Sequence, residues 1–246
     1  MIFLAGCAHP SPDGVAFGAF GDVPYTQDEV ERVDRMIDEM NAVPLAFVVH
    51  VGDIGSSTLA CRDDWLRARK QQFARIRHPF VLLPGDNEWS DCKDPLERLR
   101  VWRGLFCFNE KLAVERQAGP FCEHIRWESG GTLFVALNVP GHDNNVRHAE
   151  HAARMVAVFA WMDESAALAR ERKLRLAVLM QADPFLTAPR DGFAPLREKL
   201  ASLGAQQPTI LIHGDTHIYR DDEPIPGVRR IEVWGSPIVS WLRLSF

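Results

Sequence analysis

The sequence predicts an α/β fold with a mainly parallel β-sheet, and two observations lead to this prediction. Apolar strands alternate with helix-length segments along the first part of the chain, which is the order of a parallel α/β sheet. The strands are almost continuously apolar, which indicates that both faces of the sheet are covered. The chain has 246 residues, of which 46% are hydrophobic, enough for one large domain with a sizeable core.

The N-terminal half of the chain predicts three strands, each followed by a helix. The first helix has Thr26 or Asp28 as its candidate N-cap and carries apolar residues at helical spacing. The expected elements are strands at 14–22, 44–53 and 79–86 and helices at 26–43, 63–77 and 95–106. Strand, helix, strand is the unit that builds parallel sheets, so these strands should lie side by side.

The C-terminal half adds further strands and two further helices. A Ser-Gly-Gly sequence within residues 121–140 predicts a hairpin turn, and Gly204 is expected at a helix C-cap. The other expected elements are helices at 151–173 and 193–205, strands at 174–185 and 207–219, and a closing pair of strands within 228–246. No linker-like stretch interrupts this pattern, so residues 14–246 are predicted to form one domain.

The composition argues against several classes of protein. The formal net charge is −5, without a basic cluster, so no nucleic-acid partner is expected. No run of 18 apolar residues predicts a membrane-spanning helix. A Gly-x-Gly-x-x-Gly turn after a strand is missing, which disfavours a dinucleotide-binding protein. A Gly-x-Ser-x-Gly elbow is also missing, which disfavours a serine hydrolase.

The N-terminus resembles part of a bacterial lipoprotein signal. Leu4-Ala5-Gly6-Cys7 fits a lipobox, after which Cys7 would carry the lipid and provide the only link to a membrane. Only six residues precede Cys7, fewer than the apolar region of about 7–15 residues that a signal peptide needs. Residues 1–13 are therefore expected to be a signal remnant or a tether. The lipobox predicts an exported protein, in the periplasm or the cell envelope; the alternative is the cytoplasm.

Four cysteines remain besides the one in the lipobox, and an even number suits disulfide pairing in an oxidising compartment. Cys61 and Cys92 follow two strands whose ends should be neighbours, so they are expected to pair. Cys107 and Cys122 flank one short segment and form the second expected pair. The alternative is that all the cysteines are free thiols in a cytosolic protein.

Polar side chains with ligand chemistry follow the apolar strands. They are Asp22, Asp53, Asp86 with Asn87, and Asp215 with His217. In open α/β sheets, ligands bind beyond the carboxyl ends of the strands, where these side chains would converge. Asp is common in ordinary turns, but the repeated Gly-Asp after a strand and the sequence His-Gly-Asp-Thr-His favour convergence on a metal.

At these motifs the sequence resembles the calcineurin-like metallophosphoesterase superfamily, over nearly the whole chain. That family has the motifs D-x-H, G-D, G-N-H-[DE], a His after a strand, and G-H-x-H, in this order. The corresponding stretches here read GDVPY, VGDIG, PGDNEW, MQADPF and GDTHIY. Order and spacing agree while identities differ, as in a divergent bacterial branch with its own GDNEW motif. The resemblance implies a four-layer α/β/β/α sandwich of the metallo-dependent phosphatase type.

The resemblance assigns roles to the first three motifs position by position. Asp22 matches the first metal-binding Asp, but Pro24 stands where a ligating His is expected. Asp53 matches the Asp that bridges two metals. Asp86 stands at a ligating Asn, and Asn87 stands at the His that assists catalysis. A shift by one residue would instead place Asn87 on the ligating position.

The last two motifs also depart from the family. Ala182 or Asp183 falls where a ligating His is expected, with Gln181 adjacent. Asp215 replaces the first His of G-H-x-H, and His217 keeps the second. Asp183 and His213 are therefore candidate metal ligands or supporting groups.

The resemblance implies a metal-dependent phosphoesterase that hydrolyses a phosphate ester at a carboxylate-rich, dinuclear site. One or two divalent cations are expected; oxygen ligands favour Mn²⁺ or Mg²⁺, with Fe and Zn as alternatives. Four clustered carboxylates without a cation would repel one another, which supports this expectation. The substrate would be a phosphorylated small molecule or head group. The alternative is a non-catalytic relative that binds metal or a phosphorylated ligand.

Four residues are candidates for catalysis or substrate binding. Asn87 occupies the position of the catalytic His but has no titratable proton, so Glu88 is the candidate acid. Arg62 is a candidate phosphate contact because it follows a strand-end loop. His142 follows another strand, where it is either a residue that lines the cleft or part of an ordinary turn.

Overall fold

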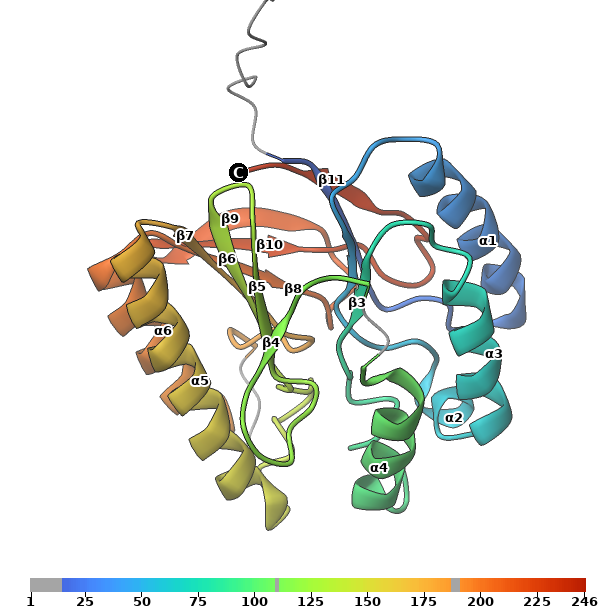
Figure 1. The fold of residues 1–246 in the computed structure, drawn as a ribbon. Coiled ribbons are helices and arrows are strands. Elements are labelled where there is room, and N and C mark those ends of the chain that lie inside the picture. The colour runs from blue at the N-terminus through green and yellow to red at the C-terminus, as the bar shows by residue number, and fades with distance from the viewer. Residues whose placement is uncertain (1–14, 109–110, 187–190) are drawn as a thin grey trace, which may run out of the picture.

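The structure is a computed structural model that describes residues 15–108, 111–186 and 191–246. The expected tether and the lipid attachment at Cys7 lie outside the described residues. Two β-sheets pack face to face, and helices cover the outer side of each sheet (Figure 1). The four-layer α/β/β/α sandwich is thereby confirmed.

The smaller sheet has the strand order β11-β1-β2-β3. Its strands are β1 (Phe17–Phe20), β2 (Val48–His50), β3 (Phe80–Leu82) and β11 (Leu242–Leu244). The first three are parallel, and β11 runs antiparallel to β1. The helices on its outer side are α1 (Gln27–Asn41), α2 (Ser57–Ala60), α3 (Asp63–Phe73) and α4 (Pro95–Phe106) (Figure 1).

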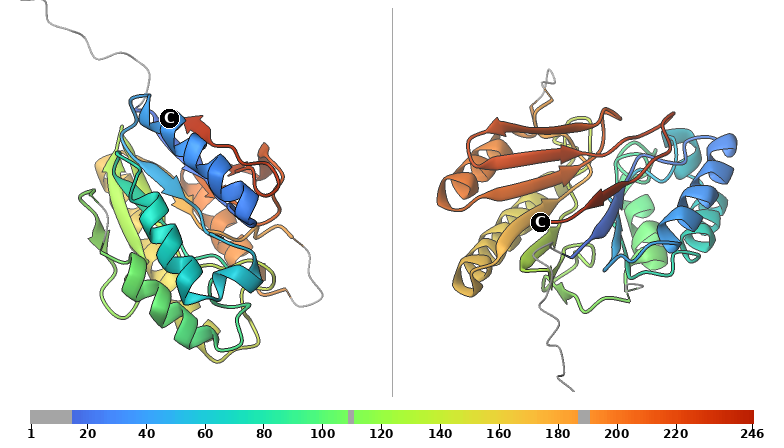
Figure 2. Two further views of the ribbon diagram at one scale, coloured as in Figure 1. Left: turned by 90° about the vertical axis from the view of Figure 1, so that its right-hand side faces the viewer. Right: turned by 90° about the horizontal axis from the view of Figure 1, so that it is seen from above.

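The larger sheet has the strand order β4-β5-β6-β7-β8-β10-β9. Its strands are β4 (Glu115–Arg116), β5 (Ile125–Ser129), β6 (Thr132–Ala136), β7 (Arg175–Leu179), β8 (Thr209–His213), β9 (Arg220–Ile225) and β10 (Val228–Glu232). The central strands β6, β7, β8 and β10 are parallel. Helices α5 (Glu150–Arg172) and α6 (Ala194–Gln206) cover its outer face (Figure 2).

Three apolar clusters fill the spaces between the four layers. The central one, between the sheets, includes Phe17, Phe47 and Phe134. The Phe47 ring lies 4.7 Å from the Phe17 ring and 4.9 Å from the Phe134 ring. Each fully buried side chain of this kind contributes about 1.5–3 kcal/mol. Because both sheets bury their inner faces in this one cluster, they stay packed together, and the carboxyl ends of their parallel strands lie next to each other.

Helix α1 begins where its sequence indicates and fixes the loop that precedes it. The Thr26 hydroxyl accepts a hydrogen bond from the Glu29 N–H at 3.3 Å, which confirms Thr26 as the N-cap. The buried Glu29 carboxylate accepts the Tyr25 N–H at 2.6 Å and the Ser236 hydroxyl at 2.7 Å. Glu29 therefore joins the loop after β1 to the loop after β10.

The C-terminal strands differ from the expected closing pair. Strand β10 pairs with β8 and β9 in the larger sheet, whereas β11 pairs with β1 in the smaller one. Strand β9 was not predicted because its sequence, RDDEPI, has no apolar alternation. It is an exposed edge strand, in which polar residues and Pro are tolerated.

Gly204 was expected at the C-cap of α6, but the helix continues through Gln206. A Cβ atom on Gly204 would lie 2.8 Å from the Pro226 carbonyl oxygen and 3.0 Å from the Gly227 carbonyl carbon. The glycine is therefore required for close packing of α6 against the β9–β10 turn. Among the helices described, none has the length and hydropathy needed to cross a bilayer.

Candidate metal centre

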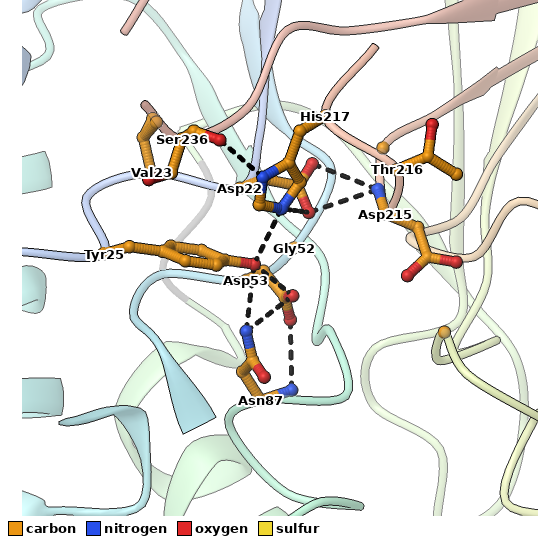
Figure 3. Close-up of polar contacts among 12 residues, drawn as sticks. Asp22, Val23, Tyr25, Gly52, Asp53, Asn87, Asp215, Thr216, His217 and Ser236 are labelled. Atoms are coloured by element: carbon orange, nitrogen blue, oxygen red, sulfur yellow. Dashed lines mark hydrogen bonds and ion pairs between the residues drawn. The ribbon is translucent and has the colours of Figure 1, made fainter. Parts of the chain in front are cut away.

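The loops that follow the parallel strands of both sheets meet at one edge of the sandwich. From the smaller sheet come Asp22, Asp53 and Asn87; from the larger sheet come Asp215 and His217 (Figure 3). The strands end there because a Gly-Asp or Pro-Gly-Asp turn follows each apolar run. The structure therefore brings the strand-end residues together, as expected for the carboxyl edges of parallel strands.

Asp22 anchors one side of the centre. Its two carboxylate oxygens accept the Asp215 N–H at 3.1 and 3.2 Å. The His217 Nε2 atom lies 3.8 Å from Asp22 Oδ1. His217 Nδ1 lies 2.6 Å from the Ser236 carbonyl oxygen, so it must carry the proton and donate. Nε2 then keeps its lone pair, which faces the centre and is available to a metal.

Asp53 anchors the other side through the GDNEW loop. Its Oδ1 accepts the Asn87 backbone N–H at 3.1 Å, and its Oδ2 accepts the Asn87 side-chain amide at 2.9 Å. Tyr25 donates its hydroxyl to the same Oδ2 at 2.6 Å. The Tyr25 oxygen also lies 2.9 Å from Asn87 Nδ2 and 3.3 Å from His217 Nε2. This hydroxyl thus connects the two sides of the centre (Figure 3).

Gly141, in the loop after β6, approaches the carboxylates of both Asp86 and Asp215. A Cβ atom on Gly141 would come within 2.3 Å of Asp215 Oδ1 and 2.8 Å of Asp86 Oδ2. Only glycine leaves room for both carboxylates. Gln181 closes this side: its Oε1 accepts the Gly141 N–H, and its Nε2 lies 3.4 Å from Asp215 Oδ1.

The backbone at the centre is held in an unusual conformation. Four of the predicted ligands have φ in the left-handed region: Asp22 at 53°, Asp53 at 60°, Asp215 at 84° and His217 at 64°. Non-glycine residues adopt this region infrequently, and each instance costs of order 1 kcal/mol or more. Such residues gather at functional sites, where the surrounding structure holds them in place.

The electrostatics of the centre reflect crowded negative charge. Burial, with repulsion from Asp215 and Asp86, raises the pKa of Asp22 well above its usual range. Burial, followed by repulsion from Asp86 and Glu88, does the same for the pKa of Asp53. For the same reasons the pKa of Asp86 rises to about 8, and burial chiefly raises that of Asp215 to about 6. Each shift means that the ionised form is destabilised where no cation compensates it.

Glu88, the candidate acid, is fully buried behind the centre. Its Oε1 accepts the backbone N–H groups of Asp53 at 3.0 Å, Gly85 at 3.2 Å and Ile54 at 3.4 Å. One oxygen thus ties the turn after β2 to the turn after β3. This geometry fits a positioning residue, and Tyr25 has the hydroxyl that faces the centre.

Asp183 and His213 belong to a second buried cluster behind Asp215. With Glu232 they bring ligand-type atoms within 4.8 Å of one another. Arg220 forms an ion pair with Glu232, and Arg230 lies 3.4 Å from the Asp183 carboxylate. Arg230 also binds Asp222 at 2.6 Å, so the two guanidinium groups are shared among three carboxylates, and Asp183 and Glu232 each have a cationic side chain beside them.

The second cluster supports the loop that carries Asp215. The Asp183 N–H donates to Asp215 Oδ2 at 3.1 Å, and the Thr216 N–H donates to Glu232 at 3.0 Å. The structure therefore places Asp183 in contact with Asp215 through its backbone, while its side chain faces the arginines. His213 Nε2 lies 4.0 Å from Asp183 Oδ1.

The two candidate substrate contacts differ in their position. His142 is exposed and adjoins Gly141, so it lies at the rim beside Asp86 and Asp215. Arg62 is a surface residue at the N-terminus of α3, where its guanidinium binds Asp64. Among the described contacts, none joins Arg62 to the centre.

Both expected disulfides are present, Cys61–Cys92 and Cys107–Cys122. The first joins the α2–α3 junction to the end of the GDNEW loop. This disulfide therefore links the loop that carries Asp86 and Asn87 to helix α2, the first helix after Asp53.

Sequence reasoning missed two residues of the centre. Tyr25 stands three residues after Asp22, one position beyond the D-x-H motif in which Pro24 replaces the His, so the motif assigns it no role. Gln181 was noted only as a neighbour of the expected ligand. The available signal was position: each follows a strand that ends at the same edge as Asp22 and Asp215.

The donor set fits divalent cations. The centre offers four buried carboxylates with raised pKa values, the Nε2 lone pair of His217 and the Tyr25 hydroxyl oxygen. Carboxylate oxygens are common ligands of divalent cations.

Comparison with solved structures relates the whole sandwich to metal-dependent phosphatases. A dimetal phosphatase from Danio rerio matches with a TM-score of 0.62, over 91% of this chain and 88% of that chain, at 14% identity. The purple acid phosphatase PPD1 from yellow lupin (Lupinus luteus) matches with a TM-score of 0.53, over 94% of this chain and 47% of that chain, at 13% identity. The chain therefore has the fold of the metal-dependent phosphatases. Comparisons with protein-family models and with curated proteins gave no match.

Proposed function

We propose that this protein is a metal-dependent phosphoesterase that acts on a phosphorylated small molecule or head group. The observation that carries the proposal is the gathering of four strand-end carboxylates at the edge shared by the two sheets, where the Tyr25 hydroxyl links Asp53 to His217. We further propose Mn²⁺ or Mg²⁺ as the cation, because oxygen donors outnumber nitrogen donors.

Two groups of side chains are proposed to hold the cations. Asp22 and His217 form the first group, and Asp86 and Asp215 form the second. Asp53 is proposed to belong to both. Bound cations would neutralise the phosphate charge and lower the pKa of a bound water towards about 7. Asn87 and Tyr25 hold the Asp53 carboxylate in a fixed orientation by two short hydrogen bonds.

Tyr25 is proposed to assist the leaving group. Asn87, at the position where the family resemblance places a catalytic His, can donate a hydrogen bond but not a proton. The Tyr25 hydroxyl lies 2.9 Å from the Asn87 amide, and a phenol carries its proton at neutral pH. In the structure this proton is donated to Asp53 Oδ2. We propose that the hydroxyl exchanges this acceptor for the departing oxygen, while the Asn87 amide, which donates to the Tyr25 oxygen, orients it.

The alternative is a non-catalytic relative that keeps the metal centre and binds a phosphorylated ligand. The absence of the family's histidines at Pro24, Asn87 and Asp215 favours it. Two disulfides support export to an oxidising compartment, which we propose as the location of either form. A lipid anchor at Cys7 stays a prediction.

Calorimetry with Mn²⁺ and hydrolysis of aryl and alkyl phosphates test the proposal together. We expect Mn²⁺ to bind, and Asp53→Ala to abolish both most of this binding and hydrolysis. The matched control is Asp163→Ala, which removes an exposed carboxylate on α5. Binding of Mn²⁺ without turnover of any ester would support the alternative, and no uptake of any divalent cation would refute both.

A further inference from the structure

Arg69 in α3 is a buried cation that forms no ion pair with any acidic side chain of residues 15–108, 111–186 and 191–246. Its side chain is 5% exposed, and its Nε and Nη1 atoms are shielded from solvent without a hydrogen-bond partner in the part of the chain that the structure describes. Burying a charged guanidinium without compensation is unfavourable. Burial accordingly lowers the pKa of Arg69 to about 10. A group of this kind calls for a physical explanation.

The nearest acidic groups are engaged elsewhere. Asp34 exerts an attractive field on Arg69, but its carboxylate forms an ion pair with Arg75 and accepts the Gln72 amide at 2.9 Å. Asp64 forms its ion pair with Arg62. The positive charge of Arg69 is therefore not balanced by a direct contact.

The guanidinium of Arg69 is held in place by Trp65. It stacks on the indole ring, with 4.4 Å between the guanidinium carbon and the ring centroid. The indole is itself fixed, because Nε1 donates to the Ile54 carbonyl oxygen at 2.7 Å and packs against Gly55. The aromatic ring holds the guanidinium in one orientation, and because Nε and Nη1 are shielded, Nη2 is the donor that a phosphate or carboxylate oxygen meets in a charge-assisted hydrogen bond.

Arg69 lines a pocket of about 330 Å³, together with Arg62, Asp64, Trp65 and Gln27. Two cations and one anion give the lining a net positive charge. A pocket of this volume accommodates a phosphate group with part of the molecule that carries it.

The pocket adjoins the metal centre through two chain segments. Gln27 is two residues from Tyr25, whose hydroxyl binds Asp53. On the other side, the Ile54 carbonyl that holds Trp65 directly follows Asp53. The pocket therefore lies on the α1–α3 side of the centre, beside the residues proposed to act there.

From this geometry we propose that Arg69 and the surrounding pocket form an anion-binding subsite for a phosphate or carboxylate group. The anion binds the Arg69 guanidinium, with Gln27 and Arg62 at the entrance. The anion is either a second anionic group of the substrate or a free phosphate, and the two sources share this chemistry. Only the first source rests on the proposed phosphoesterase function.

Calorimetry with inorganic phosphate, on metal-free protein prepared with a chelator, tests the subsite apart from the metal centre. We expect one phosphate site in the wild type, and Arg69→Met to weaken it by about ten- to hundredfold. The matched control is Arg67→Met on the same helix, whose arginine is exposed and does not line the pocket. Equal affinity in wild type and Arg69→Met, or no phosphate binding by the wild type, overturns the proposal.

Thermal unfolding shows whether a loss of binding reflects misfolding. We expect Arg69→Met to unfold at or above the wild-type temperature without phosphate, because an uncompensated buried charge is removed. Phosphate should raise the unfolding temperature of the wild type and of Arg67→Met but not of Arg69→Met. Equal stabilisation of all three proteins by phosphate overturns the proposal.

Kinetics on the Mn²⁺-loaded protein separates the two sources of the anion. If the anion belongs to the substrate, Arg69→Met lowers kcat/KM for a bisphosphate ester at least about tenfold more than for the matching monophosphate ester. If Arg69→Met lowers kcat/KM equally for the two esters and also abolishes phosphate binding by the metal-free protein, the site binds free phosphate. Hydrolysis that persists without any phosphate site refutes the subsite alone, whereas a phosphate site without hydrolysis refutes the phosphoesterase function alone.

Discussion

Tyr25 is the residue at which the two halves of the metal centre meet, because its hydroxyl contacts Asp53, Asn87 and His217. We predict that Tyr25→Phe lowers kcat for alkyl phosphates by about 10²–10⁴-fold, the usual contribution of a positioned proton donor. The kcat for aryl phosphates should decrease much less, since their leaving groups need little protonation. Steady-state kinetics on both ester types checks this, with the exposed Tyr219→Phe as the control. Equal losses on both esters would assign Tyr25 to metal binding instead.

The Cys61–Cys92 disulfide is the feature that matters at the scale of elements, because it fastens the GDNEW loop to the α2–α3 junction across a sequence separation of 31 residues. We predict that replacing both cysteines by Ser lowers the free energy of unfolding by about 2–4 kcal/mol. It should also weaken Mn²⁺ binding, because the loop that carries Asp86 and Asn87 loses its anchor.

The Cys107–Cys122 disulfide provides the matched control for that prediction. Its removal should lower the free energy of unfolding but leave the Mn²⁺ affinity unchanged, because it lies outside the strand-end loops of the centre. Urea unfolding and calorimetry on both double variants give the comparison. An equal effect of the two variants on Mn²⁺ affinity would contradict the anchoring role.

At the scale of the whole molecule, two buried histidines couple stability to pH. Burial lowers the pKa of His50 and of His124 to about 4. In the unfolded chain a His pKa is about 6.5, so between pH 6.5 and 4 the unfolded state binds protons that the folded state does not. Stability from this source is complete above pH 6.5 and decreases as the pH falls, by up to about 3 kcal/mol for each His.

A difference measurement isolates this effect. The raised pKa values of the centre's carboxylates change stability in the opposite direction, so the wild type is compared with His124→Gln in the presence of Mn²⁺. We predict that the variant loses less free energy of unfolding than the wild type between pH 7 and 5, whereas the exposed His148→Gln matches the wild type. Parallel pH profiles for the wild type and His124→Gln would rule out a contribution from His124.

The order of apolar strands and helices predicts a parallel α/β sheet and the strand ends that carry the site, whereas the four layers were implied only by the family resemblance. Continuous apolar strands such as residues 45–51 can only lie in a sheet covered on both faces, and a Gly-Asp turn ends them. These are local properties of the chain. Parallel strands of one sheet share a carboxyl edge, so Asp22 and Asp53 are neighbours by their place in the sequence. Asp215 belongs to the second sheet and reaches them because the two sheets pack face to face.

The directions in which the side chains at that edge point depend on packing between distant segments. Glu88 adjoins Asn87 in the sequence, yet its carboxylate turns inward to three backbone N–H groups while Asn87 faces Asp53. Tyr25 reaches the centre, and β11 joins β1 across almost the whole chain. The physical reason is that the carboxylate of an acid after a strand can either point into the cleft or accept hydrogen bonds from buried backbone N–H groups. Contacts with segments far away in the sequence determine which of the two occurs.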